Sequence, residues 1–220
     1  MASKVPSWLA GRLLAVVALA GLGAGGVHMA HQQAQPKLAE LHQAQTDPYV
    51  VAVAADLDTS AAVKVAMVMG HYYESSGKHI GWPYVDRLGR GQPLTVCNGI
   101  TGQGVHAGRY YTPEDCYQLE KKRYIASERD AKQVLQHWRR YDAFVQAVFI
   151  DFVHNKGSAN FRTSSMLRKA NAGDLIGACA ENPRWNKGTV NGVRTVLPGL
   201  QLRGDANAEL CASWRLEVSP

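Results

Sequence analysis

Residues 61–99 decide the fold, and they read AAVKVAMVMGHYYESSGKHIGWPYVDRLGRGQPLTVCNG. A polar group, Asp58-Thr59-Ser60, precedes an apolar run, which predicts a helix that begins at Ala61 and ends near Tyr73. Ser75-Ser76-Gly77 then stops this helix. Beyond it, glycines and prolines separate short β-forming pieces such as Leu94-Thr95-Val96-Cys97. The stretch therefore predicts one core helix followed by a small lobe of hairpins and turns.

The rest of the chain is predicted to be mostly helical. Thr112-Pro113-Glu114-Asp115 starts a helix, with threonine as the N-cap and Asp115 placed for a capping box, so both acids are interpreted as capping residues. Apolar residues recur at helical spacing, and the predicted helices span Ala131–Arg140, Asp142–His154, 164–170, 173–180 and 205–213. The predicted fold class is α+β, with a small β-rich lobe, a larger helical lobe and a cleft between them for an extended substrate.

The first thirty residues read as an export segment. Lys4 and Arg12 precede the apolar run Leu13–Met29, whose 17 residues are at the low end of what spans a bilayer. Alanine and glycine fill more than half of Ala15–Gly26, which makes the segment a weak anchor. A cleaved signal peptide, a permanent anchor and a weak anchor that can leave the bilayer all remain open. In each case the basic flank stays in the cytoplasm and the bulk of the chain is exported.

The four cysteines fit an oxidising compartment. Cys97, Cys116, Cys179 and Cys211 are even in number, so an exported domain would form two disulfides from three connectivities. We favour the local pairs Cys97–Cys116 and Cys179–Cys211. No C-x-x-C pair occurs, so neither a zinc ribbon nor a thioredoxin-type site is predicted.

Composition narrows the classes of function. Apolar residues make up 46% of the 220, which excludes wholesale disorder. The net charge of +6 favours an anionic partner without choosing between nucleic acid, a lipid surface and an acidic wall polymer. The basic runs Lys121-Lys122-Arg123 and Arg139-Arg140 are most simply solvated helix faces, so no nucleic acid is predicted. The eight histidines are scattered without an H-E-x-x-H motif, and no metal or cofactor is predicted.

Three residues could carry chemistry. Glu74 lies where the first core helix meets the β-rich lobe, and desolvation there would raise its pKa, as a general acid requires. Asp86 and Thr95 follow within the lobe. An acid, a second carboxylate and a hydroxyl on one cleft wall can protonate a leaving oxygen and position a water.

These motifs resemble the phage lysozymes (endolysins) of glycoside hydrolase family 24. That family carries a Glu at the end of its first helix, an Asp in a Tyr-x-Asp turn and a Thr in the next strand. The resemblance covers roughly residues 61–215 and continues through Thr112–Cys116, Asp151–Gly157 and Met166–Asp174. Eleven residues separate Glu74 from Asp86 and eight separate Asp86 from Thr95, each three more than is usual in the family. We attribute both excesses to turn insertions.

The resemblance implies a lysozyme-like fold and a muramidase. Glu74 would protonate the glycosidic oxygen, while Asp86 and Thr95 would hold the attacking water and stabilise the developing positive charge. The bond cut would be the β-1,4 link between N-acetylmuramic acid and N-acetylglucosamine in peptidoglycan, with no metal or cofactor. Two alternatives stay open: a lytic transglycosylase acting on the same bond, and a catalytically degenerate wall-binding protein.

The resemblance also suggests how the chain is delivered and divided. Residues 1–30 would be a signal-anchor-release segment, 31–59 a linker and 60–220 the lysozyme-like catalytic domain. Through residues 8–30 the protein would sit in the host inner membrane, facing the periplasm, and then be released into the periplasm to lyse the cell. Membrane proximity, disulfide isomerism or both would keep the tethered form inactive. The active protein is expected to be a monomer.

Overall fold

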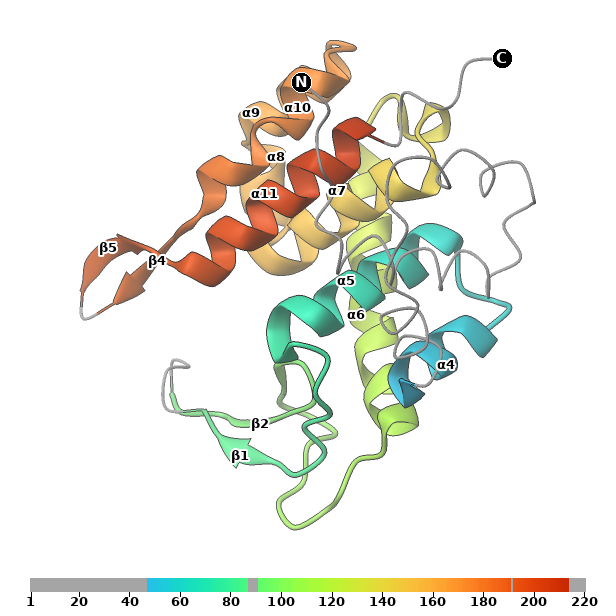
Figure 1. Cartoon of the computed structure of the whole chain (residues 1–220), viewed down its shortest axis with the longest axis vertical. Coiled ribbons are helices and arrows are strands. Elements are labelled where there is room, and N and C mark those ends of the chain that lie inside the picture. The colour runs from blue at the N-terminus through green and yellow to red at the C-terminus, as the bar shows by residue number, and fades with distance from the viewer. Residues whose placement is uncertain (1–46, 87–90, 191, 214–220) are drawn as a thin grey trace, which may run out of the picture.

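The computed structural model describes residues 47–86, 91–190 and 192–213 (Figure 1). The predicted signal-anchor segment and the first part of the predicted linker lie outside these residues. The helices are α4 (Pro48–Ala55), α5 (Ala61–Ser75), α6 (Pro113–Val134), α7 (Ala143–Lys156), α8 (Ser158–Arg162), α9 (Ser165–Asn171), α10 (Leu175–Cys179) and α11 (Pro198–Ser213), with 3-10 turns at Trp138–Arg140 and Asn182–Trp185. The strands are β1 (Tyr84–Val85), β2 (Leu94–Val96), β3 (Ile100–Thr101), β4 (Lys187–Val190) and β5 (Val193–Val196).

Helix α5 is the predicted core helix. Its N-cap Ser60 accepts a hydrogen bond from the backbone of Val63, and 12 of its 15 residues are buried. The helix ends two residues later than predicted, at Ser75, because Ser76 adopts the left-handed conformation (φ 56°). Gly70 allows α6 to approach closely, since a Cβ there would lie 1.9 Å from the hydroxyl of Tyr124.

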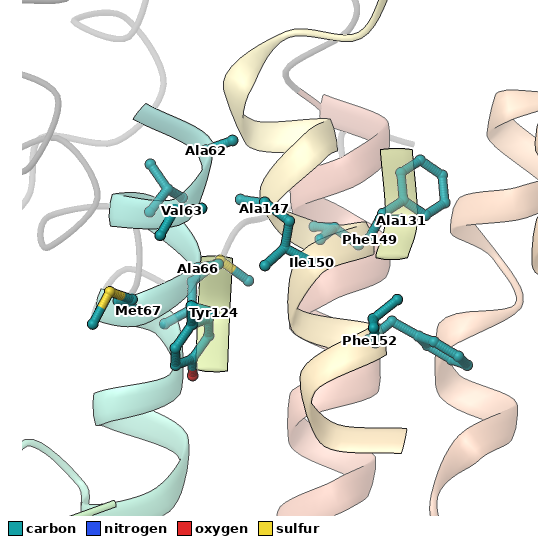
Figure 2. Close-up of a cluster of buried hydrophobic side chains, with 14 of the residues drawn as sticks. Ala62, Val63, Ala66, Met67, Tyr124, Ala131, Ala147, Phe149, Ile150 and Phe152 are labelled. Carbon is teal, nitrogen blue, oxygen red and sulfur yellow. The ribbon is translucent and has the colours of Figure 1, made fainter. Parts of the chain in front are cut away.

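Helix α7 is the centre of the helical lobe. Asp142 caps it through hydrogen bonds from the backbones of Phe144 and Val145, and 9 of its 14 residues are buried. Figure 2 shows its side chains meeting those of α5 and α6; the labelled residues are Ala62, Val63, Ala66 and Met67 of α5, Tyr124 and Ala131 of α6, and Ala147, Phe149, Ile150 and Phe152 of α7. A helix buried on nearly all sides is typical of the core of a helical domain.

The predicted capping box at the start of α6 is confirmed, but the next predicted helix is wrong. The Thr112 hydroxyl accepts from the backbone of Asp115, whose carboxylate accepts from the backbone of Thr112. The predicted helix Ala131–Arg140 is wrong: Ala131 belongs to the last turn of α6, which ends at Val134. The side chain of Asn171 explains this end, because it donates to the Val134 carbonyl (2.9 Å) and accepts from the backbone N–H of Gln136 (2.9 Å).

The β-rich lobe is a three-stranded antiparallel sheet in the order β1-β2-β3. Thr95 in the central strand pairs with Tyr84 on one side and with Thr101 on the other. The Cys97–Cys116 disulfide ties this lobe to α6, and Cys179–Cys211 ties α10 to α11, so both favoured pairs are confirmed. The prediction of an α+β fold is confirmed as well.

A second sheet was not predicted. Strands β4 and β5 form an antiparallel hairpin that projects from the helical lobe (Figure 1). All four residues of β5 are exposed. Its base is closed by the Leu197 N–H, which donates to the Asn186 carbonyl at 2.9 Å.

The predicted linker 31–59 needs a correction at its end. Residues 48–55 form α4, and Tyr49, Val50 and Val53 of this helix are buried in the core. Asp47 is the N-cap of α4 and Pro48 occupies the first turn, where a missing N–H costs nothing. Among the residues described, the helices are all too short or too polar to cross a bilayer.

Candidate active site

Glu74 projects from the last turn of α5 and remains accessible. Its side chain is 41% exposed and forms an ion pair with Nη1 of Arg203, which comes from α11. The expected burial of Glu74 is therefore wrong, because the carboxylate lies at the end of the helix rather than beneath the β-rich lobe. What fixes the carboxylate is the guanidinium behind it.

Arg203 is buried and held from two sides. Its Nη2 and Nε donate to the two oxygens of Asp151 in α7, at 2.6 and 3.0 Å. Burial alone would lower the pKa of Arg203, but the carboxylates of Asp151 and Glu74 raise it. This bidentate pairing leaves the guanidinium little freedom, so it presents Nη1 to Glu74 in one orientation.

Two neutral side chains complete this ion cluster, which consists of Tyr73, Glu74, Asp151, Arg203 and Asn207. The amide of Asn207 donates to Asp151 Oδ2 at 2.7 Å and accepts from the hydroxyl of Tyr73 at 3.0 Å. Asp151 is 1% exposed and its charge is met by three hydrogen bonds. The cluster joins α5, α7 and α11; Tyr73 is partly buried, and Glu74 is the member classed as exposed.

Asp86 and Thr95 lie in the neighbouring lobe, and Tyr84 relates them to Glu74. The pKa of Tyr84 is raised by partial burial and then by the negative charges of Asp86 and Glu74. Tyr84 is also the strand partner of Thr95. The structure thus brings the three predicted residues to one neighbourhood, where the end of α5 meets β1 and β2.

The two lobe residues differ in accessibility. The backbone N–H of Asp86 donates to the Pro93 carbonyl at 3.0 Å, and its side chain is partly exposed. Thr95 is 2% exposed, and its hydroxyl donates to the same carbonyl at 3.1 Å. Only the lone pairs of the Thr95 hydroxyl therefore stay available for a further partner.

His154 lies beside the ion cluster without joining it. Its ring stacks on that of Tyr124, with centroids 3.9 Å apart and planes 13° apart. Burial lowers the pKa of His154 to about 4, more strongly than Asp151 raises it. The imidazole is therefore neutral at pH 7. Among the described residues, no three or more His, Cys, Asp or Glu side chains are grouped to hold a metal ion.

Arg203 and Asn207 were not predicted as site residues, and Asp151 was named only as part of a matching segment, with no role assigned to it. A signal was present in α11: Arg203, Ala206, Asn207 and Leu210 fall on one helical face, and all four are buried. An arginine on a buried face requires a partner, because an unpaired buried charge is strongly unfavourable. The partner could not be named, because Asp151 and Glu74 are 52 and 129 residues away in the sequence.

A second buried polar cluster ties α4 to the β-rich lobe; it comprises Asp47, Tyr49, His71, Asn98 and Glu120. Glu120 is 1% exposed and accepts hydrogen bonds from the Tyr49 hydroxyl and from the backbone and amide of Asn98. His71 donates from Nε2 to Asp47 (3.2 Å) and accepts at Nδ1 from Asn98 (3.3 Å). Tyr49 stacks on His71 at 4.3 Å. Each of these side chains contacts at least one other member, and Asp47 also accepts from the Tyr72 hydroxyl at 3.2 Å; we refer to this set as the closed cluster.

The sequence of this chain is similar to those of known phage proteins. The family model described as phage lysozyme matches residues 82–207, which begins eight residues after Glu74. A SAR-endolysin of Bacteriophage PS119 is 35% identical over 129 residues, covering 59% of this chain and 72% of that protein. A SAR-endolysin of Enterobacteria phage PA-2 is 34% identical over 129 residues, covering 59% and 73%.

Solved structures agree on the fold. The endolysin from Escherichia coli O157:H7 phage FAHEc1 superposes with a TM-score of 0.60 at 18% identity, covering 70% of this chain and 92% of that one. Likeness at this identity speaks for the fold alone. The expectation of a lysozyme-like fold is therefore confirmed.

Proposed function

The chain belongs to the phage lysozyme family, and on that premise we propose that it hydrolyses the β-1,4 bond between N-acetylmuramic acid and N-acetylglucosamine. The protein is a peptidoglycan-degrading endolysin that serves host cell lysis, as its family and its SAR-endolysin relatives indicate. No cofactor enters this proposal.

One observation carries the assignment of the acid. Glu74 is an accessible carboxylate that a buried, doubly held arginine fixes in place, at the junction of the two lobes. A general acid must lie within hydrogen-bond reach of the atom it protonates, and a fixed orientation favours that geometry. We assign Glu74 as the acid that protonates the leaving glycosidic oxygen. The family model begins after Glu74, so its match does not cover this residue; the resemblance of the sequence around Glu74 and the geometry of its ion pair support the assignment.

Asp86 and Thr95 take the second role in this proposal. They would hold the attacking water, and the Asp86 carboxylate would stabilise the positive charge that develops on the sugar ring. The shared neighbourhood of Asp86, Glu74 and Tyr84 supports this division.

We also propose a route to the wall. Residues 8–30 would insert in the host inner membrane as a weak anchor, with the catalytic domain on the periplasmic side, and then leave it as a monomer. The SAR-endolysin relatives and the two disulfides support this route, since disulfides persist in the periplasm. The residues of the anchor lie outside the described structure.

Mass analysis of the released muropeptides tests the reaction. The purified, oxidised full-length chain would be incubated with peptidoglycan, and its products compared with those of a Glu74→Gln variant. Hydrolysis predicts reducing muropeptides of full mass from the parent chain and none from the variant. Products lighter by one water would instead identify a lytic transglycosylase. If the parent chain and the variant are both folded and both leave the peptidoglycan intact, the wall-binding alternative would be favoured.

A further inference from the structure

Three aromatic rings form an exposed group on the β-rich lobe; we call this group, made of His79, Trp82 and Tyr110, the aromatic platform. The rings of Trp82 and Tyr110 lie 5.2 Å apart at 58°, and the rings of His79 and Tyr110 lie 5.7 Å apart at 80°. Trp82 is 61% exposed and Tyr110 is 47% exposed. Two large rings are thus held together at the surface rather than in the core.

The backbone holds this platform in a fixed shape. The Tyr111 N–H donates to the Gly81 carbonyl at 2.8 Å, and the His79 ring donates from Nε2 to the Tyr111 carbonyl at 2.8 Å. Gly81 is required for this approach, because a Cβ there would lie 2.5 Å from the Tyr111 carbonyl and 2.6 Å from the Tyr110 ring. The platform is therefore preorganised, and binding to it would cost little ordering of side chains.

Trp82 lies in a bend two residues before β1, the strand that leads to Asp86. Trp82 precedes Asp86 by four residues, which is at most about 13 Å along the chain. Tyr84 lies between them, within the field of both Asp86 and Glu74. A polymer that lies across Asp86 therefore reaches Trp82 if it follows this strand.

We propose that the aromatic platform binds the glycan strand of peptidoglycan beyond the bond that is cut. The apolar face of a pyranose ring packs on an aromatic face, while its hydroxyl groups stay in water. Two rings are too few for a stable protein interface, which buries on the order of 1,200 Å² or more. His79 Nε2 is already bonded to the Tyr111 carbonyl, so the platform presents mainly the exposed rings of Trp82 and Tyr110. This inference rests on the proposed muramidase function.

Binding to defined wall fractions tests the platform. All variants are made in a full-length Glu74→Gln chain, so that the glycan is not consumed, and co-sedimentation with purified sacculi gives the affinity. Trp82→Ala is expected to weaken binding about tenfold, as removal of one stacked aromatic does elsewhere. Trp82→Tyr should restore most of it. Ile176→Ala, which removes an exposed apolar side chain of α10, should leave it unchanged.

The class of ligand is tested in the same assay. Glycan strands stripped of stem peptides should compete with sacculi for the parent chain, and free stem peptides should not. The loss from Trp82→Ala should be the same at low and high salt, because stacking is not screened. The platform proposal is overturned if Trp82→Ala binds sacculi like the parent, or if only stem peptides compete. Undiminished hydrolysis by the Glu74→Gln chain would count against the proposed function instead.

Discussion

Two polar clusters include side chains of α5 and are built from similar groups, but they differ in whether a carboxylate is exposed. The ion cluster around Arg203 joins α5 to α7 and α11 and leaves the Glu74 carboxylate 41% exposed. The closed cluster around Glu120 joins α4, α5 and α6 to the β-rich lobe, and each of its charged or polar side chains binds another member. The first holds a carboxylate that is 41% exposed, whereas the side chains of the second are buried or only partly exposed.

The difference indicates which buried charges serve chemistry. A closed set of hydrogen bonds can hold elements in register, which is a structural role. In the ion cluster, the buried Arg203 fixes the exposed carboxylate of Glu74, and packing of the core does not require a carboxylate at that position. We therefore expect changes in the ion cluster to affect activity and stability together, and changes in the closed cluster to affect stability alone.

Removal of Arg203 should have the largest effect on stability. Arg203→Met leaves Asp151 buried without its cation, and breaking a buried pair in this way lowers the free energy of unfolding by about 3–5 kcal/mol. The rate of cell-wall hydrolysis should fall as well, because no cation then fixes the orientation of the Glu74 carboxylate. Urea denaturation measures the first effect. The exposed Arg139→Met serves as the control and should change stability by less than about 0.5 kcal/mol. A stable Arg203→Met protein would contradict the account.

His154, a neighbour of Asp151 in the ion cluster, should make the free energy of unfolding depend on pH. Its pKa is about 4 in the folded protein and 6.5 in the unfolded chain, so between these values the unfolded state binds more protons. The contribution of His154 to stability should therefore be almost complete above pH 6.5 and fall by about 3 kcal/mol as the pH drops to 4. His154→Phe should lose that part of the slope while keeping the stack on Tyr124. Parallel stability curves for the two proteins would refute this assignment.

The closed cluster should respond more weakly. Tyr49→Phe keeps the stack on His71 but removes the hydroxyl that donates to buried Glu120, which should lower stability by about 1–2 kcal/mol. Clearing activity per folded molecule should stay at the parent value. Thermal unfolding and a clearing assay below the melting temperature measure the two effects. Loss of activity in a fully folded Tyr49→Phe protein would mean that the two clusters do not differ as described.

Local signals in the sequence predicted much of the fold. Caps and apolar runs gave α5, the capping box of α6, and α7, because these features act within a few residues. The disulfide pairs followed from proximity in sequence. The hairpin of β4 and β5 was missed although Val190-Asn191-Gly192-Val193 carries the Asn-Gly turn signal, because its strands are exposed and show no apolar alternation toward a core.

The site was less predictable than the fold. A family resemblance could point to Glu74, Asp86 and Thr95, but the residues that hold Glu74 come from α7 and α11, far away in the sequence. Likewise α4 was read as linker, because a short apolar run has no meaning until the core that buries it is known. Long-range ion pairs of this kind require the tertiary structure.

The most direct test of Glu74 as the acid is an assay that measures how fast permeabilised Gram-negative cells are cleared. It compares the oxidised full-length chain with its Glu74→Gln and Glu114→Gln variants. Glu114 is a matched control, since it is an exposed carboxylate in the first turn of α6. We predict that Glu74→Gln clears at least about a hundredfold more slowly at an unchanged melting temperature, while Glu114→Gln clears at the parent rate. Clearing by Glu74→Gln at the parent rate would contradict the assignment of Glu74 as the acid.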